Sequence, residues 1–195
     1  DYPDVTHWKQ KSIEAVLQLY EDHPTLDKKV SSLQALAETD LPLLSAIVQN
    51  RIGELYHQSA ENLLAKEAYQ KTIVKGVDEE TFKARFALAS IYAEEENFDK
   101  SLSVYREISS ETDAIKPHIQ SARAGLIQKT LEKGDWELRV GEIKLARKTF
   151  LHLIKTYPET VKAHRGYLQA SAALGRESVQ FYHERLKTRQ DSAVE

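Results

Sequence analysis

The chain has 195 residues, of which 41% are hydrophobic and 29% are charged, a composition typical of a soluble helical protein rather than a disordered one. Its 27 basic and 30 acidic side chains give a formal net charge of −3, which supplies no general attraction to nucleic acid or to anionic lipid. The sequence has no cysteine, so disulfides, thiol catalysis and thiolate metal sites are excluded.

The sequence also lacks methionine, and we therefore expect an excised or processed segment of a longer protein. No apolar run approaches the roughly 18 residues that a membrane-spanning helix needs, and no basic-then-apolar leader begins the chain. The absence of cysteine fits a periplasmic or secreted module as well as a cytoplasmic one. The sequence leaves the compartment open.

Residues 1–45 are predicted to hold a partial repeat followed by a linker helix. The segment Ile13–Tyr20 ends just before a proline, as the second helix of an earlier hairpin would. The segment Leu26–Glu38 has the apolar spacing of a separate helix, and Asp40 can cap the helix that follows it.

Residues 46–79 carry the pattern of two amphipathic helices joined by a polar turn. Gly53 and Tyr56 belong to the first helix, and Ala65 and Tyr69 belong to the second. Small residues at Gly53 and Ala65 allow two antiparallel helices to approach closely, while the tyrosines fill the space beside them. The segment therefore predicts a helical hairpin.

The same layout returns in residues 82–115. Tyr92 occupies the first helix and Tyr105 the second, at the same spacing as the tyrosines of the preceding copy. In the charged turn between them, Asn97 can take a positive φ and Asp99 can cap the next helix. We expect this turn to face water.

An insertion of about 12 residues follows, between Ile115 and Ile127, and is the largest irregularity in the pattern. Apolar positions continue through it, so we expect one long helix that begins near Pro117 and reaches Leu138. Irregularities of this kind occur where an array of repeats bends or where a partner docks, and a harmless insertion is the alternative.

Residues 127–160 and 161–194 form the third and fourth copies. They begin 34 residues apart, and each places a glycine at its fifteenth position, Gly141 and Gly175, between two predicted helices. The third copy carries Glu137 where a tyrosine would be expected. Self-similarity at a period of 34 residues indicates stacked helical hairpins.

The pattern resembles the tetratricopeptide repeat, W-x2-L-G-x2-Y, then A-x3-F, then P. Ala146 and Phe150 match the second half of that motif, whereas Gln49 and Val77 stand at its tryptophan and proline positions in the first copy. The resemblance implies an all-α, right-handed superhelical solenoid of antiparallel helix pairs. It also implies about four repeats that form one continuous solenoid through residues 46–195.

In proteins similar to this family, the first helix of each pair lines a concave wall that binds extended peptides or partner helices. The mixed charges and one aromatic side chain on such a wall suit hydrogen bonding to a peptide backbone, and ordinary solvated positions are the alternative. Glu54 would repel a C-terminal carboxylate, so the carboxylate clamp of some family members is not reproduced. The resemblance assigns to this predicted wall Asn50, Glu54, His57, Gln58, Lys83, Phe86, Ser90, Glu94, Asp135, Arg139, Lys162, Arg165 and Gln169.

No cluster of residues predicts a catalytic, cofactor or metal site. The seven histidines are scattered, without His-x3-His spacing or an adjoining Glu-x-x-His face, and the phosphate-loop and nucleophile-elbow motifs do not occur. The acidic runs 78–80 and 94–96 lie at helix ends, where carboxylates face solvent or favour the start of a following helix. Trp136 could anchor a ligand, but we favour its packing between adjacent hairpins.

We therefore interpret the chain as a non-catalytic scaffold, part of a larger bacterial protein, that binds a partner protein or peptide. It is expected to bind no nucleic acid, to insert into no membrane and to need no cofactor. Two alternatives stay open. The chain is a self-association module that forms homo-oligomers through its end repeats, or it is a helper domain of an enzyme or export component whose active part lies outside it.

Overall fold

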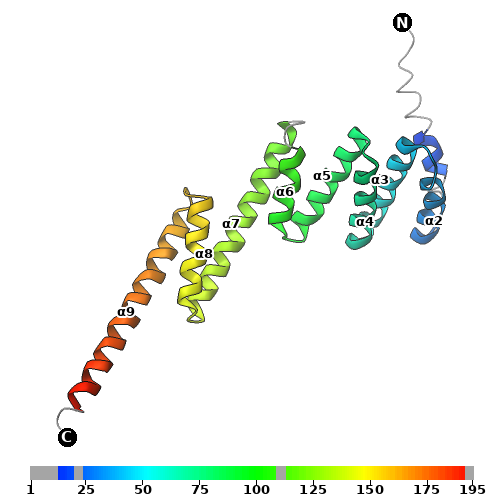
Figure 1. The fold of residues 1–195 in the computed structure, drawn as a ribbon. Helices are drawn as coiled ribbons and strands as arrows, with labels where there is room; N and C mark the ends of the chain where they lie inside the picture. The colour runs from blue at the N-terminus through cyan, green and yellow to red at the C-terminus, as the bar shows by residue number, and fades with distance from the viewer. Residues whose placement is uncertain (1–12, 20–23, 109–112, 192–195) are drawn as a thin grey trace. The chain divides into compact units, whose positions relative to one another are not determined.

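The structure is a computed structural model that describes residues 13–19, 24–108 and 113–191, with side chains described as far as residue 180 except at position 178. All regular secondary structure in these residues is helical (Figure 1). The residues group into two compact units, Asp1–Ala122 and Arg123–Glu195.

The first unit is a series of antiparallel helices joined by short turns. Each packs against the next from α2 to α6, and α3 also contacts α5, two helices further along (Figure 1). This second contact is the one that stacked hairpins make, because first helices of successive repeats lie side by side. The elements are a helix at 13–19, α2 (Leu26–Ala37), α3 (Pro42–Gln58), α4 (Asn62–Lys75), α5 (Asp78–Glu94), α6 (Phe98–Ile108), the 3-10 helix η1 (Asp113–Ile115) and the start of α7 (Lys116–Arg139).

Three hairpin turns share one backbone conformation. Ala60, Glu96 and Gly141 have φ values of 61°, 56° and 84°, and each lies midway between the end of one helix and the start of the next. A left-handed residue at this place lets the following N–H groups bond to the carbonyls of the last helical turn. The sequence predicts the positive φ at Asn97, but the structure has it one residue earlier, at Glu96. The bonds that close the turns run from the N–H of Glu61, Asn97 and Glu142 to the carbonyls of Tyr56, Tyr92 and Glu137, over 2.9, 2.8 and 2.9 Å.

The close approach of α3 and α4 depends on small residues, as the sequence predicts. Ala65 is completely buried, and Tyr69 is 2% exposed. A Cβ atom added at Gly53 would lie 2.7 Å from Cε1 of the Tyr69 ring, closer than non-bonded carbon atoms can come. The tyrosine ring therefore packs against the backbone of α3, at a place that only glycine leaves open.

The N-terminal helices pack on α3. Leu17, from the helix at 13–19, shares a buried cluster with Val30 and Leu33 of α2 and with Ile52 of α3. α2 also contacts α3 directly. The interpretation of residues 1–45 as a partial repeat followed by a linker helix stays a prediction.

The second unit is built around Phe150. It contains α7 from residue 123 onward, α8 (Ile143–Thr156) and α9 (Val161–Asp191), and α8 packs against α9. The Phe150 ring is completely buried. A Cβ atom added at Gly134 of α7 or at Gly166 of α9 would lie 2.6 or 2.5 Å from that ring. Two glycines on different helices therefore make room for one side chain of α8.

Glu137 fills the position at which a tyrosine was expected. Its side chain is 1% exposed, and its Oε2 accepts a hydrogen bond of 2.7 Å from the hydroxyl of Thr149 on α8. The ammonium of Lys133, one turn earlier on α7, lies 3.9 Å from its Oε1. A polar link between α7 and α8 thus replaces the aromatic packing of the earlier copies.

The helix boundaries agree with one prediction and correct another. α7 runs over Lys116–Arg139, as expected for a helix that begins near Pro117 and reaches Leu138. The fourth copy is different, because α9 continues without a break through Gly175, where a turn between two helices was predicted. A single glycine inside a helix costs only about 1 kcal/mol relative to alanine, and helix-forming residues flank it.

The continuous solenoid of four repeats over 46–195 stays a prediction.

Candidate functional site

A cleft of about 430 Å³ opens in the first unit between the helix at 13–19, α3 and α5. Asn50 and Glu54 of α3 and Lys83 of α5 line it, and all three belong to the predicted wall. The stacking of α3 on α5 brings them together, although they are far apart in the sequence. Arg51 and Glu80 also line the cleft, so its walls carry both charges.

Asn50 and Glu80 join α3 to α5 beneath the cleft. The Asn50 amide nitrogen donates to the backbone carbonyl of Glu80 at 3.0 Å and to its Oε2 at 2.6 Å. The two residues are only 5% and 6% exposed. The amide nitrogen of Asn50 is thus bonded within the protein, whereas its Oδ1 is buried without a hydrogen-bond partner among the described residues, and the assignment of Asn50 to a partner-binding wall stays a prediction.

Lys83 lines the cleft and pairs with two carboxylates. Its ammonium donates to Oε1 of Glu80 at 2.8 Å and pairs with Oε1 of Glu79 at 2.9 Å. Partial burial lowers the pKa of Lys83, but the hydrogen bonds to Glu80 and Glu79 outweigh it, so the net shift of this pKa is upward. Lys83 therefore remains an ammonium at neutral pH, and it offers a positive charge rather than a base.

Replacing Asn50 by alanine should destabilise the protein by about 1–3 kcal/mol, because Oε2 and the backbone carbonyl of Glu80 would lose their buried donor. Urea unfolding followed by circular dichroism measures this change. Gln49→Ala, at the preceding and more exposed position of α3, is the control and should change stability by about 0.5 kcal/mol or less. Equal stability of Asn50→Ala and the wild type would show that the hydrogen bonds from Asn50 to Glu80 do not stabilise the folded protein.

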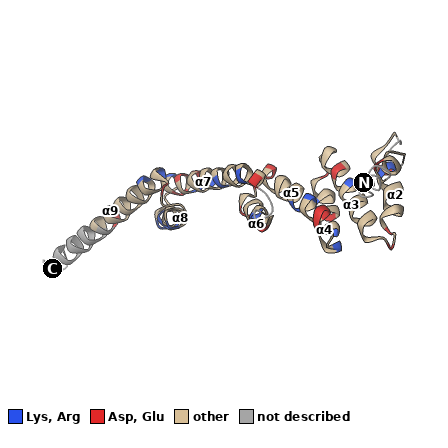
Figure 2. Ribbon diagram, turned by 90° about the horizontal axis from the view of Figure 1, so that it is seen from above, with Lys and Arg blue, Asp and Glu red and all other residues tan. Residues whose placement is uncertain are grey.

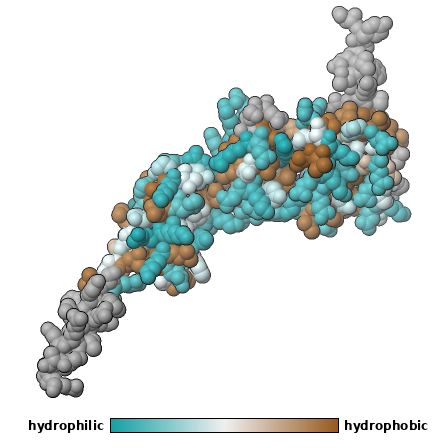
Figure 3. All heavy atoms as spheres, in the orientation of Figure 1, coloured by the Kyte–Doolittle hydropathy of each residue, from teal (hydrophilic) through white to brown (hydrophobic). Residues whose placement is uncertain are grey.

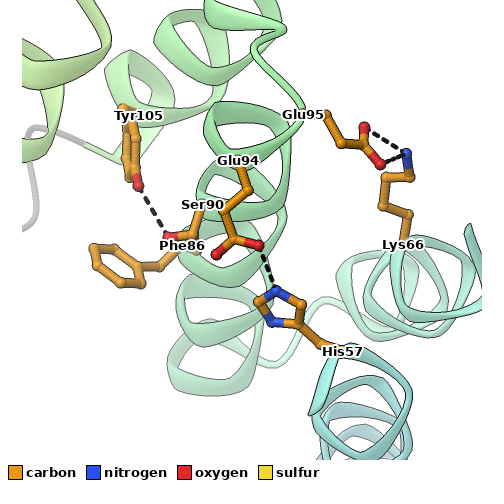
Figure 4. Close-up of polar contacts among 7 residues, drawn as sticks. All are labelled: His57, Lys66, Phe86, Ser90, Glu94, Glu95 and Tyr105. Carbon is orange, nitrogen blue, oxygen red and sulfur yellow. Dashed lines mark hydrogen bonds and ion pairs between the residues drawn. The ribbon is translucent and has the colours of Figure 1, made fainter. Parts of the chain in front are cut away.

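Further polar contacts join α3, α4 and α5 beside the cleft (Figure 4). The imidazole of His57 on α3 lies 2.8 Å from a carboxylate oxygen of Glu94 on α5. Lys66 on α4 pairs with Glu95, just beyond the end of α5, at 2.7 Å. This contact brings the predicted wall residues His57 and Glu94 together between the successive first helices α3 and α5.

Phe86 of the predicted wall is held by aromatic contacts. Its ring meets the Tyr105 ring edge to face, with centroids 5.8 Å apart, and the His118 ring at 4.9 Å. The Tyr105 hydroxyl lies 3.0 Å from the Ser90 hydroxyl, and Figure 4 shows this pair beside Phe86. Burial raises the pKa of Tyr105, although the hydrogen bond with Ser90 acts in the opposite direction. Phe86 is half-buried and presents only part of its ring.

The wall residues of the second unit are exposed. Asp135 and Arg139 lie one turn apart on α7, and Lys162, Arg165 and Gln169 follow one face of α9. The structure does not join these two groups through any hydrogen bond among the residues it describes. The prediction that Trp136 packs between hairpins is wrong: its side chain is 55% exposed, because its neighbours Gly134 and Glu137 face α8 instead.

Sequence reasoning missed Glu80, Arg51 and the helix at 13–19 as parts of the cleft. The spacing of Glu80 and Lys83 allows an ion pair along one helix face, which was a usable signal. The bond from Asn50 to Glu80 gave no such signal, because it joins different helices. Arg51 was outside the predicted wall, yet it pairs with Glu54 at 2.7 Å and turns toward the cleft.

Neither a metal site nor a membrane span is found in the described part of the chain. No group of three or more histidine, aspartate or glutamate side chains there could hold a metal ion. None of the described helices combines the length and the apolar character needed to cross a bilayer. Hydrophilic residues predominate on the face drawn in Figure 3, with smaller hydrophobic patches between them.

The helix pairing, the repeated turns and the cleft between first helices define an all-α protein of stacked helical hairpins with a tetratricopeptide-like fold. No protein-family model and no curated protein matches the sequence. A solved structure of MamA from AMB-1 is similar at 16% sequence identity and a TM-score of 0.35, over 92% of this chain and 87% of that one.

Proposed function

We propose that this protein is a non-catalytic scaffold of the tetratricopeptide repeat family that holds an extended segment of a partner protein along α3 and α5. The observation that carries the proposal is the cleft of about 430 Å³ beside α3 and α5, whose lining includes Glu54 and Lys83 of the predicted wall. Its rim offers a guanidinium, a carboxylate and an ammonium, from Arg51, Glu54 and Lys83. Such a set can bond to a peptide backbone and distinguish charged side chains.

The state of the charged groups supports binding rather than catalysis. A general base or nucleophile must have a free lone pair at working pH, yet Lys83 is held protonated by Glu79 and Glu80. Glu54 is paired with Arg51, and the carboxylate of Glu80 accepts bonds from both Asn50 and Lys83. These groups are arranged as fixed charges.

Swapping the charges of one ion pair tests the proposal in the full-length protein. Arg51→Glu combined with Glu54→Arg keeps both the net charge and an i,i+3 pair on α3, but it exchanges the charges at the cleft. We expect a partner captured by chemical crosslinking in the native cell to be lost by at least about tenfold, since like charges would face each other at a specific contact.

The matched control exchanges another i,i+3 pair of the first unit, with Asp113→Lys and Lys116→Asp. This pair lies outside the cleft, so the control should capture the partner as the wild type does. Helicity and melting temperature should be unchanged in both variants. Undiminished capture by the Arg51/Glu54 swap would remove the cleft as the binding site for that partner.

The exposed cations of α9 provide an independent test in the second unit. Reversing Lys162 and Arg165 to glutamate should weaken capture of the same partner if its segment also contacts the predicted wall there. Both side chains are exposed, so helicity measured by circular dichroism should not change. Equal capture by this variant would restrict the proposed site to the first unit.

Self-association is a second candidate function, favoured by the opposite charges of the two units. Residues 1–122 hold 13 basic and 21 acidic side chains, whereas residues 123–195 hold 14 basic and 9 acidic ones. Complementary surfaces of this kind attract a second copy, and salt screens the attraction. Sedimentation velocity over a range of protein concentrations would show a growing, salt-sensitive oligomer in this case and a constant monomer otherwise.

A further inference from the structure

The outward face of α8 is a basic stripe. Lys144, Arg147, Lys148 and Lys155 are all exposed, and their spacing of i, i+3, i+4 and i+11 places them on one side of the helix. Leu151, at i+7, lies in the middle of the same side. The opposite side of α8 is buried in the core of the second unit, and Figure 2 shows the blue basic residues gathered on α8.

The charges of this α8 stripe are not neutralised by the rest of the unit. The helix Ile143–Thr156 has no acidic residue, and none of its four cations forms an ion pair with a carboxylate in the part of the chain that the structure describes. By contrast, Lys66 on α4 pairs with Glu95. The guanidinium of Arg147 lies 5.8 Å from the centre of the Tyr167 ring, a cation–π contact that orients it toward α9.

A groove follows the stripe. It has a volume of about 420 Å³ and is lined by Lys144, Arg147 and Lys148 together with Leu151 of α8 and Leu174 of α9. Three cations and two leucines therefore line the same groove. A ligand that fits must offer negative charges at the rim and an apolar group that enters between Leu151 and Leu174.

We propose that this α8 groove binds an acidic peptide segment of a partner protein, with carboxylates on the lysines and arginine and an aliphatic side chain in the groove. The surface is separate from the cleft lined by α3 and α5. A peptide supplies both charge and apolar side chains, which a nucleic acid backbone does not. A membrane is also a poor match, because the apolar side of α8 is turned into the core and cannot enter lipid.

Fluorescence anisotropy of a labelled 12-residue peptide of glutamate, aspartate and leucine tests the proposal with the whole chain, about 12 residues being enough to follow the stripe along α8. We expect Lys144→Glu combined with Lys148→Glu to weaken binding by at least about tenfold, since two attractive contacts become repulsive. The neutral pair Lys144→Gln and Lys148→Gln should weaken it less. Leu151→Ser should weaken binding of this peptide but not of an equally charged peptide without leucine.

The control is Lys71→Glu combined with Lys75→Glu, which makes the same charge change at i,i+4 on the exposed side of α4. It should bind the peptide as the wild type does. Equal weakening by this control would overturn the proposal, since it would show only a dependence on net charge. Tighter binding of a 12-base-pair DNA duplex than of the peptide would also overturn it. A dimer of the wild type that is absent in the Lys144→Glu, Lys148→Glu variant would overturn the proposal as well, because the stripe would then bind a second copy of this chain.

Discussion

Replacing Phe150 by alanine should destabilise the second unit by about 3–5 kcal/mol, the cost of removing a fully buried aromatic ring that its surroundings cannot refill. The ring lies between Gly134 and Gly166, so its loss leaves a space lined by two helix backbones, which cannot collapse as side chains can. Hydrogen–deuterium exchange should show amides of α8 and of α9 near Gly166 losing protection, while those of α3 and α4 keep it.

Leu145→Ala is the matched control for this prediction. Leu145 lies on the same helix but is 44% exposed, so its truncation should change stability by about 0.5 kcal/mol. A change of similar size in the two variants would contradict the central role of Phe150. Uniform loss of protection in both units would show that they unfold together.

The hairpins could be predicted from the sequence because their signals are local. A small residue and an aromatic residue recur at fixed spacing, and the structure uses that spacing to pack Tyr69 on Gly53 and Phe150 on Gly134. The long helix α7 could be predicted for a similar reason, since its apolar positions continue without interruption through the insertion. Local periodicity therefore identified the helices and the close contacts within a hairpin.

The features that were missed depend on which partner a residue meets. Gly141 and Gly175 hold equivalent places in the 34-residue period, yet the first has a φ of 84° and the second is helical. Gly141 is followed by a separate helix, α8, whereas Gly175 lies inside the single helix α9. In the same way, Asn50 fits the wall by its register, but Glu80 on the next first helix draws it into a buried pair.

The candidate site was therefore predicted in part. The register selected Glu54 and Lys83, which the structure places at one cleft, and His57 and Glu94, whose side chains are 2.8 Å apart. The register does not include the helix at 13–19, because that segment precedes the first predicted copy, which begins at residue 46. The α8 stripe was outside the prediction altogether, since the resemblance directs attention to first helices.

Replacing Gly53 by leucine should unfold the hairpin of α3 and α4. The free energy of unfolding should fall by about 3 kcal/mol or more, at the upper end of the usual cost of overpacking. The Cβ atom alone would lie 2.7 Å from the Tyr69 ring, and the ring, which is 2% exposed, has no free space into which it can move. Thermal unfolding followed by circular dichroism should show a lower melting temperature. Glu54→Leu, one residue further along α3 at an exposed position, introduces the same side chain without the clash and should melt within a few degrees of the wild type.

A double variant identifies the Tyr69 ring as the cause. Gly53→Ala should be destabilising by itself, because its single methyl group already meets the ring, and Tyr69→Leu should be destabilising because it leaves a cavity. The double variant should lower the free energy of unfolding by less than the sum of the two single changes. The smaller leucine makes room for the new methyl group, and that methyl group fills part of the cavity. Strict additivity would mean that the two positions are not in contact, and the register of the first hairpin would then be wrong. A stable Gly53→Leu protein would have the same meaning, since a leucine at this position would overlap the Tyr69 ring in the present register.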